Sequence, residues 1–232
     1  MATQIDCYNL ALYKLAQSIG VPSVTDNSKA ADVLNRLWEP VRDLVLTDRV
    51  WPWAMRSQAL ALDTEPAQPG WGYRYAYPND CLTAYAVTNA GGIAQAGRLS
   101  RFADGDYLSN VWGSGAFDFD TSYGEQQTTI NTNVREAFLV YAMRVTDVSR
   151  YPPQFVNALA CRLAVEAAPP LIGDVGLNSQ QSLMQAYNLA LTNAGAHSMN
   201  ESRRDEGYLT PSLAARDGVV GLPGGIYPGS SY

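Results

Sequence analysis

The sequence predicts an α+β protein: a four-helix bundle with an inserted antiparallel β domain and an extended C-terminal tail. Apolar residues recur with helical spacing before residue 50 and again after residue 151. Between these parts, runs with every second residue apolar are separated by proline and glycine, which is typical of antiparallel strands. Neither helical part can bury its apolar stripe alone, so we expect the two to pack as one bundle. The expected domains are 1–50 with 151–200, 51–150, and the tail 201–232.

The first helix is expected over about residues 4–19 and the second over about residues 28–48. Thr3, with Asp6 three residues later, resembles a capping box at the start of the first helix. Gly20 and Pro22 follow that helix as stop signals. Pro40 lies inside the second apolar pattern, where it removes one backbone hydrogen bond and predicts a kink.

A Trp-Pro-Trp sequence follows the second helix, where the helical spacing gives way to alternation. On an extended segment, Trp51 and Trp53 lie on the same side. Together with Tyr151, where the chain returns from the β segment, we expect them to fill the seam between bundle and β domain. The competing interpretation is a stacking platform for a sugar or a base.

Strands are expected in short runs of the middle segment, at 57–63, 73–78, 82–88, 97–102 and 107–112. Asp104-Gly105 is a typical hairpin turn. The span 113–127 is predicted as a long exposed loop. The apolar run 135–145 fits helix or strand by periodicity, and its β-branched and aromatic residues favour a strand.

Helices are expected again after Pro152-Pro153, which suits a first helical turn. We expect the third helix to end at Pro169-Pro170 and the fourth to be capped by Asn178 or Ser179. After about residue 200 the apolar pattern fades, and residues 218–232 are nearly half glycine and proline, so the tail cannot build a core by itself.

The composition favours a protein that buries much of its surface against partners. Hydrophobic residues make up 47% of the 232 residues and charged residues only 16%, and there are 14 tyrosines. Arginine outnumbers lysine 14 to 2, which suits interfacial ion pairs, although codon bias explains it equally well. The net charge is −6 and no basic cluster occurs, which disfavours tight binding to nucleic acid. With no signal peptide and no apolar run near eighteen residues, the chain is expected to be made in the cytoplasm without membrane insertion.

No pattern in the sequence predicts an active site, a metal site or a cofactor. The single histidine, His197, lies near the end of the fourth predicted helix, and the three cysteines are scattered without ligand spacing. The pairs Asp104/Asp106 and Asp118/Asp120 flank turns, where carboxylates are simply solvated. We therefore expect a protein that is not an enzyme.

Three stretches in order resemble one known family. They are "VRDLVLTDRVWPWAMRSQALAL" (41–62), "GYRYAYPNDCLTAYAV" (72–87) and "YAMRVTDVSRYPPQFVNALACRLAVEAAPPLIGD" (141–174). In this order and spacing they resemble the head-to-tail adaptor (connector) proteins of tailed bacteriophages, the family that includes tail tubular protein A. The resemblance covers about residues 4–200. Where a common pattern of the family has Trp-Asn-Phe-Ala, this chain has Trp-Pro-Trp-Ala at 51–54.

The resemblance implies a structural virion protein in the neck of the tail, assembled in the host cytoplasm. Such proteins form a homo-oligomeric ring, usually of twelve copies, between the portal protein and the tail nozzle protein. Double-stranded DNA passes through the ring without specific binding. Family members commonly engage the portal with an extended C-terminal segment. In this chain the corresponding candidates are Tyr208, Leu209, Leu213, Ile226, Tyr227 and Tyr232.

Two other functions stay open at this point. The first is a tail-associated hydrolase of the cell envelope, with Glu166 or an aspartate near Asp118 as the acid. The second is a glycan-binding module formed by about residues 56–146.

Overall fold

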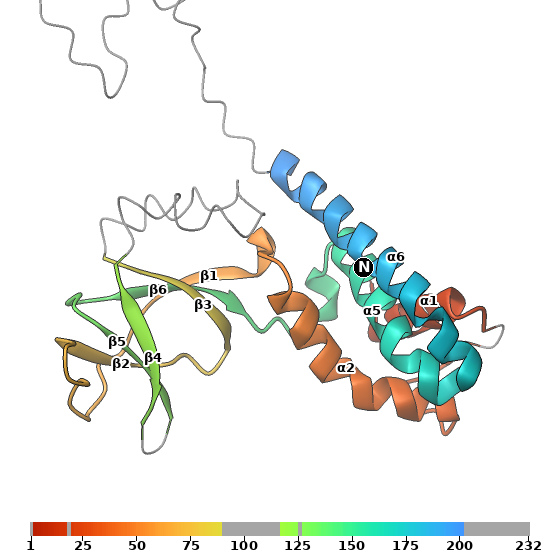
Figure 1. Ribbon diagram of the computed structural model, residues 1–232, viewed down its shortest axis with the longest axis horizontal. Helices are drawn as coiled ribbons and strands as arrows, with labels where there is room; N and C mark the ends of the chain where they lie inside the picture. Colours follow the sequence, from red (N-terminus) through yellow and green to blue (C-terminus); the bar gives the residue numbers. More distant parts are fainter. Residues whose placement is uncertain (1, 18–19, 90–116, 125–126, 202–232) are drawn as a thin grey trace, which may run out of the picture. The chain divides into compact units, whose positions relative to one another are not determined.

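A computed structural model describes residues 2–17, 20–89, 117–124 and 127–201. In this part of the chain it is α+β, with four α-helices and two small antiparallel sheets of three strands each (Figure 1). The strands occupy the chain between the second and the third α-helix. The tail from residue 202 onward, and with it the predicted strands 97–102 and 107–112 and the Asp104-Gly105 turn, lie outside the described residues.

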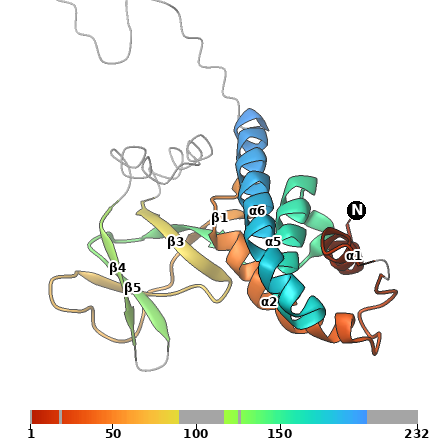
Figure 2. The same cartoon turned by 45° about the vertical axis from the view of Figure 1, so that its right-hand side comes forward.

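The helices are α1 (Gln4–Lys14), α2 (Lys29–Thr47), α5 (Pro153–Ile172) and α6 (Asp174–Glu201). α5 packs against each of the other three, and both views show α6 running alongside it (Figures 1 and 2). Side chains from all four helices share one apolar core. α5 is long and apolar enough to cross a membrane by length and composition, but 56% of that stretch is buried inside the protein. Its apolar character is therefore that of a central core helix.

The predicted helix starts are confirmed at the first two helices. The Thr3 hydroxyl accepts from the backbone N–H of Asp6, and the Asp6 carboxylate accepts from the N–H of Thr3, which completes a capping box. The Ser28 hydroxyl likewise caps α2, which continues as one α-helix through Pro40.

Three predicted helix ends are wrong by several residues. α1 ends at Lys14 rather than near residue 19, because the chain turns back and the Asn9 amide binds both the N–H (2.8 Å) and the C=O (3.2 Å) of Val21. α5 runs on through its two late prolines to Ile172. There Gly173, with φ of +59°, reverses the chain, so α6 starts at Asp174, before the expected cap at Asn178 or Ser179.

The first sheet has the order β1-β6-β3 and the second the order β2-β5-β4. Their strands are β1 (Met55–Ala59), β2 (Tyr73–Ala76), β3 (Cys81–Thr88), β4 (Phe119–Tyr123), β5 (Thr128–Thr132) and β6 (Phe138–Met143). Single bridges, Leu62 with Tyr75 and Val87 with Phe117, connect the two sheets at both of their edges. A second, smaller apolar core, which includes Val87, Ile130 and Leu139, lies between them.

Within the described residues the expected strand at 135–145 is confirmed as β6. The expected loop at 113–127 is wrong in part, because it contains β4. β4 pairs along its whole length with β5, from Phe119 opposite Thr132 to Tyr123 opposite Thr128. This ladder pairs one side of the backbone of β4, in which Phe119, Thr121 and Tyr123 favour a strand and Asp120 does not.

Candidate functional site

Trp51, Trp53 and Tyr151, the residues predicted to fill a seam, lie around one further aromatic side chain, Phe155. The ring centroids of Trp51, Trp53 and Tyr151 are 5.0, 5.0 and 4.8 Å from that of Phe155. All three pairs meet edge to face, at interplanar angles of 87°, 73° and 72°, which is the favourable arrangement for aromatic rings. Phe155 is in the first turn of α5 and is completely buried.

The polar ends of two of these rings fix the chain on either side of the β segment. The Trp51 indole N–H donates to the carbonyl of Val45 at 2.8 Å, in the last turn of α2. That carbonyl is one of those that a helix leaves without a partner. The Tyr151 hydroxyl donates to the carbonyl of Val145 at 2.7 Å, just after β6. Burial of this hydroxyl raises the pKa of Tyr151, so the group remains a donor.

The backbone conformation that brings the two tryptophans together differs from the prediction. Residues Pro52–Ala54 form a 3₁₀ turn (η1) and not an extended segment. Trp51 and Trp53 lie in the same cluster, with centroids 6.4 Å apart, because the turn folds both rings toward α5. Pro52 favours this turn because its ring holds φ near the helical value.

A network of charged groups connects α2 with the segment that leaves β6. The side chain of Arg42 is only 5% exposed, and its Nε and Nη2 donate to Asp43 Oδ1 at 2.9 and 2.8 Å. The other oxygen, Asp43 Oδ2, pairs with Nε of Arg144 at 2.9 Å. One carboxylate therefore pairs with two guanidinium groups, one on each side of the β segment.

Asp80, before β3, connects that segment with two further strands. Its backbone carbonyl accepts from the N–H of Arg144 at 2.7 Å. Its carboxylate pairs with Nη1 of Arg56 in β1 at 2.9 Å and accepts from the hydroxyl of Tyr141 in β6 at 2.9 Å. Burial, and next the carboxylate of Asp80, raise the pKa of Tyr141 to about 12. Tyr141 thus stays protonated and keeps donating at neutral pH.

These contacts bring the three family-like stretches into one place, which we call the helix–sheet junction. It comprises Arg42, Asp43, Trp51, Trp53, Arg56, Asp80, Tyr141, Arg144, Tyr151 and Phe155. Its chemistry is ion pairing, edge-to-face ring packing and hydrogen bonding to helix and strand ends. Such an arrangement holds elements in fixed positions.

Seven of the ten junction residues were missed as site residues by the sequence prediction, and three of them are central to its contacts. Phe155 was assigned only to the core stripe of its helix, and the roles of Asp43 and Asp80 were not foreseen. A signal was present in the sequence, because each of these acids stands in a charge-poor chain, within a few residues of arginine or an aromatic run. Which arginine each acid would bind depends on contacts between distant segments, for example the 101 positions from Asp43 to Arg144.

The other sequence candidates do not come together in the described part of the chain. Glu166 pairs with Arg162 one turn earlier on α5, with an N–O distance of 2.8 Å. His197 is exposed on α6, and Asp118 directly precedes β4. Among the described residues no group of three or more His, Cys, Asp and Glu side chains could hold a metal ion. The tail candidates Tyr208, Leu209, Leu213, Ile226, Tyr227 and Tyr232, and the pair Asp104/Asp106, lie outside the described residues.

Replacing Asp43 with alanine should lower the free energy of unfolding by about 2–3 kcal/mol, since it leaves the buried Arg42 without its carboxylate. The value lies below that of a fully buried pair because the Asp43 side chain is 24% exposed. Urea unfolding followed by circular dichroism measures the change. Asp32→Ala is the matched control, because its pair with Arg36 is exposed and its loss should cost about 0.5 kcal/mol or less. Equal losses in the two variants would show that the junction network adds no stability of its own.

Comparison with known proteins adds no assignment: no protein-family model matches the chain, and no curated protein matches it.

Proposed function

We propose that this chain is a structural virion protein, a head-to-tail adaptor that joins the portal to the tail nozzle of a tailed bacteriophage. In this proposal its four helices form the bundle of the adaptor, the six strands belong to the inserted domain, and residues 201–232 form the segment that binds the portal. Copies of the chain assemble into a ring, and the genome is retained in and ejected through its central channel.

One observation carries the proposal: the three stretches that resemble the adaptor family meet at the helix–sheet junction. Asp43 and Trp51 come from the first stretch, Asp80 from the second, and Arg144 and Phe155 from the third. Stretches that were similar only by chance would have no reason to contact one another. The contacts fit residues that are needed together because they hold an inserted β segment on a helical base.

The composition supports the same role. A ring subunit needs two different complementary sides, as well as faces for the portal and for the nozzle, so little of its surface stays in contact with water. A charged fraction of 16% with 14 tyrosines suits such a surface. A channel through which DNA slides must not hold phosphates tightly, and a net charge of −6 meets that requirement.

Removing residues 202–232 should leave the helices and strands folded but abolish attachment to the portal. The described helices end at Glu201, and the deletion leaves all the described residues of both apolar cores in place. Far-UV circular dichroism and urea unfolding test the fold, and sedimentation with purified portal rings, followed by electron microscopy, tests attachment. We expect the full chain to form a ring on the portal.

The matched control replaces residues 202–232 with a glycine- and serine-rich segment of equal length, which keeps the chain length but removes the tyrosines and leucines. This control should fail to attach, as the deletion does. If either the deletion variant or the substituted chain attached to the portal, the tail would be excluded as the portal-binding segment. Failure of the full chain to bind any portal ring would contradict the adaptor function itself.

A further inference from the structure

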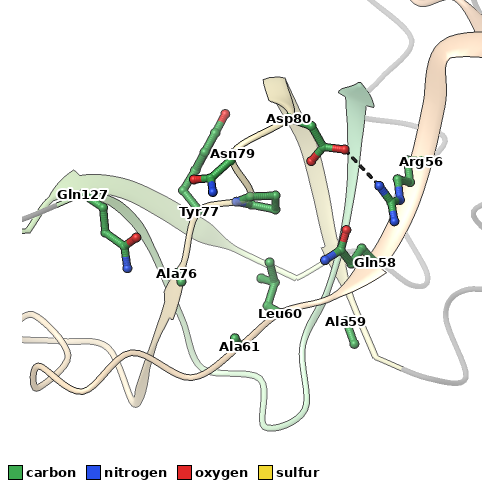
Figure 3. A pocket seen from close by; sticks show the side chains of 11 residues that line it. Arg56, Gln58, Ala59, Leu60, Ala61, Ala76, Tyr77, Asn79, Asp80 and Gln127 are labelled. Atoms are coloured by element: carbon green, nitrogen blue, oxygen red, sulfur yellow. Dashed lines mark hydrogen bonds and ion pairs between the residues drawn. The ribbon is translucent and has the colours of Figure 1, made fainter. Parts of the chain in front are cut away.

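A pocket of 440 Å³ opens next to the helix–sheet junction, where the segment after β1 passes β2 and the start of β3 (Figure 3). Its apolar wall consists of small side chains and one leucine: Ala59, Leu60, Ala61, Ala76 and Pro78. Side chains with polar groups surround this wall: Arg56, Gln58, Tyr77, Asn79, Asp80 and Gln127. Its volume is in the range of small-molecule sites.

The polar side chains of the pocket select for a ligand without net charge. Arg56 and Asp80 pair at 2.9 Å, so their charges cancel (Figure 3). Of the other four polar side chains, three are amides and the fourth is Tyr77 with its hydroxyl, and each of them can both donate and accept. Such a set matches a neutral ligand that itself carries both donors and acceptors.

One of these amides, that of Gln58, is held in place by a hydrogen bond. The oxygen of Gln58 accepts from the buried hydroxyl of Tyr141 at 3.1 Å. This contact orients the amide so that its nitrogen lies on the side of Leu60 (Figure 3). Gln127 lies across the pocket from Gln58 and Arg56 (Figure 3). A ligand on the apolar wall would therefore meet polar groups from opposite sides.

The backbone beside the pocket is already paired at the end of β2. The N–H of Ala76 donates to the carbonyl of Ala61 at 2.9 Å, and the N–H of Tyr77 donates to that of Thr128 at 3.2 Å. β1, which also lines the pocket, is an edge strand that pairs with β6. Peptides that bind by strand addition need free backbone groups at a sheet edge, so a peptide that pairs with β1 is the alternative that the experiment has to exclude.

We propose that this pocket binds a neutral saccharide. A sugar ring has a C–H face that packs on small apolar side chains, and hydroxyl groups around its edge that both donate and accept. The apolar wall suits the face, and the three amides with the Arg56–Asp80 pair suit the edge. This site is independent of the adaptor function, and each of the two assignments can fail without the other.

Saturation-transfer NMR on the full chain with three neutral trisaccharides, maltotriose, cellotriose and N-acetylchitotriose, tests the proposal. We expect signal transfer to at least one of them, and at least about tenfold weaker binding by the double variant Asn79→Ala/Gln127→Ala. Both side chains are exposed, so the double variant should fold as the original chain does. Circular dichroism checks this directly.

Gln181→Ala is the matched control, because it removes an equally exposed amide from α6. It should leave saccharide binding unchanged. The proposal is overturned if none of the three saccharides binds, or if the control weakens binding as much as the double variant. Binding of the blocked peptide acetyl-Ala-Leu-Ala-amide in the absence of saccharide binding would also overturn it, in favour of a peptide site.

Discussion

Replacing Phe155 with alanine is expected to lower the free energy of unfolding by about 3–5 kcal/mol, the cost of removing a large ring from a tightly packed core. Phe155 is completely buried and contacts Trp51, Trp53 and Tyr151. Its loss leaves a cavity that three rings line, and two of these rings, Trp51 and Tyr151, are held by hydrogen bonds to Val45 and Val145. They cannot easily move to fill the space. Since domains are stable by only about 5–15 kcal/mol, much of the protein should then be unfolded at 37 °C.

Urea unfolding followed by far-UV circular dichroism measures this loss, whereas tryptophan fluorescence would respond to the altered cluster itself. Phe155→Leu keeps most of the buried volume and should cost clearly less than the alanine variant. Tyr13→Ala, at a position that is 78% exposed, should change the free energy of unfolding by no more than about 0.5 kcal/mol. A Phe155→Ala variant as stable as Tyr13→Ala would mean that the aromatic cluster does not hold the junction.

Replacing Arg74 with alanine should cost a similar amount, about 3–5 kcal/mol, for an electrostatic reason. Its side chain is 8% exposed and pairs with Asp63 at 3.3 Å and with Glu65 at 2.8 Å. It also donates to the hydroxyl of Thr129 and to the carbonyl of Pro66. Without the guanidinium, the nearly buried carboxylate of Asp63 loses this cation, and the connection between β1 and β2 loses its attachment to β5. Urea unfolding measures the loss, and limited proteolysis should show new cleavage between residues 63 and 70.

A double variant separates the cost of an unpaired charge from the value of the pair. Arg74→Met with Asp63→Leu removes both charges and retains much of the volume, so it should recover much of the lost stability. Arg36→Ala, which removes an exposed arginine from α2, is the control and should have little effect. If the double variant were as unstable as Arg74→Ala, the hydrogen bonds of Arg74 and not its charge would account for the loss.

The elements that the sequence predicts well are those whose signals are local. The capping box of Thr3 with Asp6 places the start of α1 correctly, because this cap acts on a backbone N–H only three residues away. β6 is recognised by its β-branched and aromatic residues. The ends of α1 and α5 are predicted poorly, since they depend on a contact with Val21 and on the conformation of Gly173.

β4 and the contacts of the junction could not be predicted from the sequence, because they too depend on segments that are distant in the chain. Phe119–Tyr123 lies in a span, 113–127, whose glycines, acids and amides indicate a loop, and pairing with β5 makes it a strand. Trp51, Trp53 and Tyr151 were predicted as a group at the two ends of the β segment, and their rings lie in one cluster. The sequence offers no way to see that Phe155 lies at their centre, or that Asp43 binds Arg144, because these contacts join segments about a hundred residues apart.

The pairing of β1 with β6 has a consequence for how such a chain could change. Met55, where the chain enters the strands, lies opposite Ala142, where it leaves them. The two points are therefore only about 5 Å apart, the spacing of paired strands. An inserted domain of quite different size could connect these two positions without changing the helices that flank it. Exchange of the whole β segment at this pair of positions would let the same four helices carry many different inserted domains.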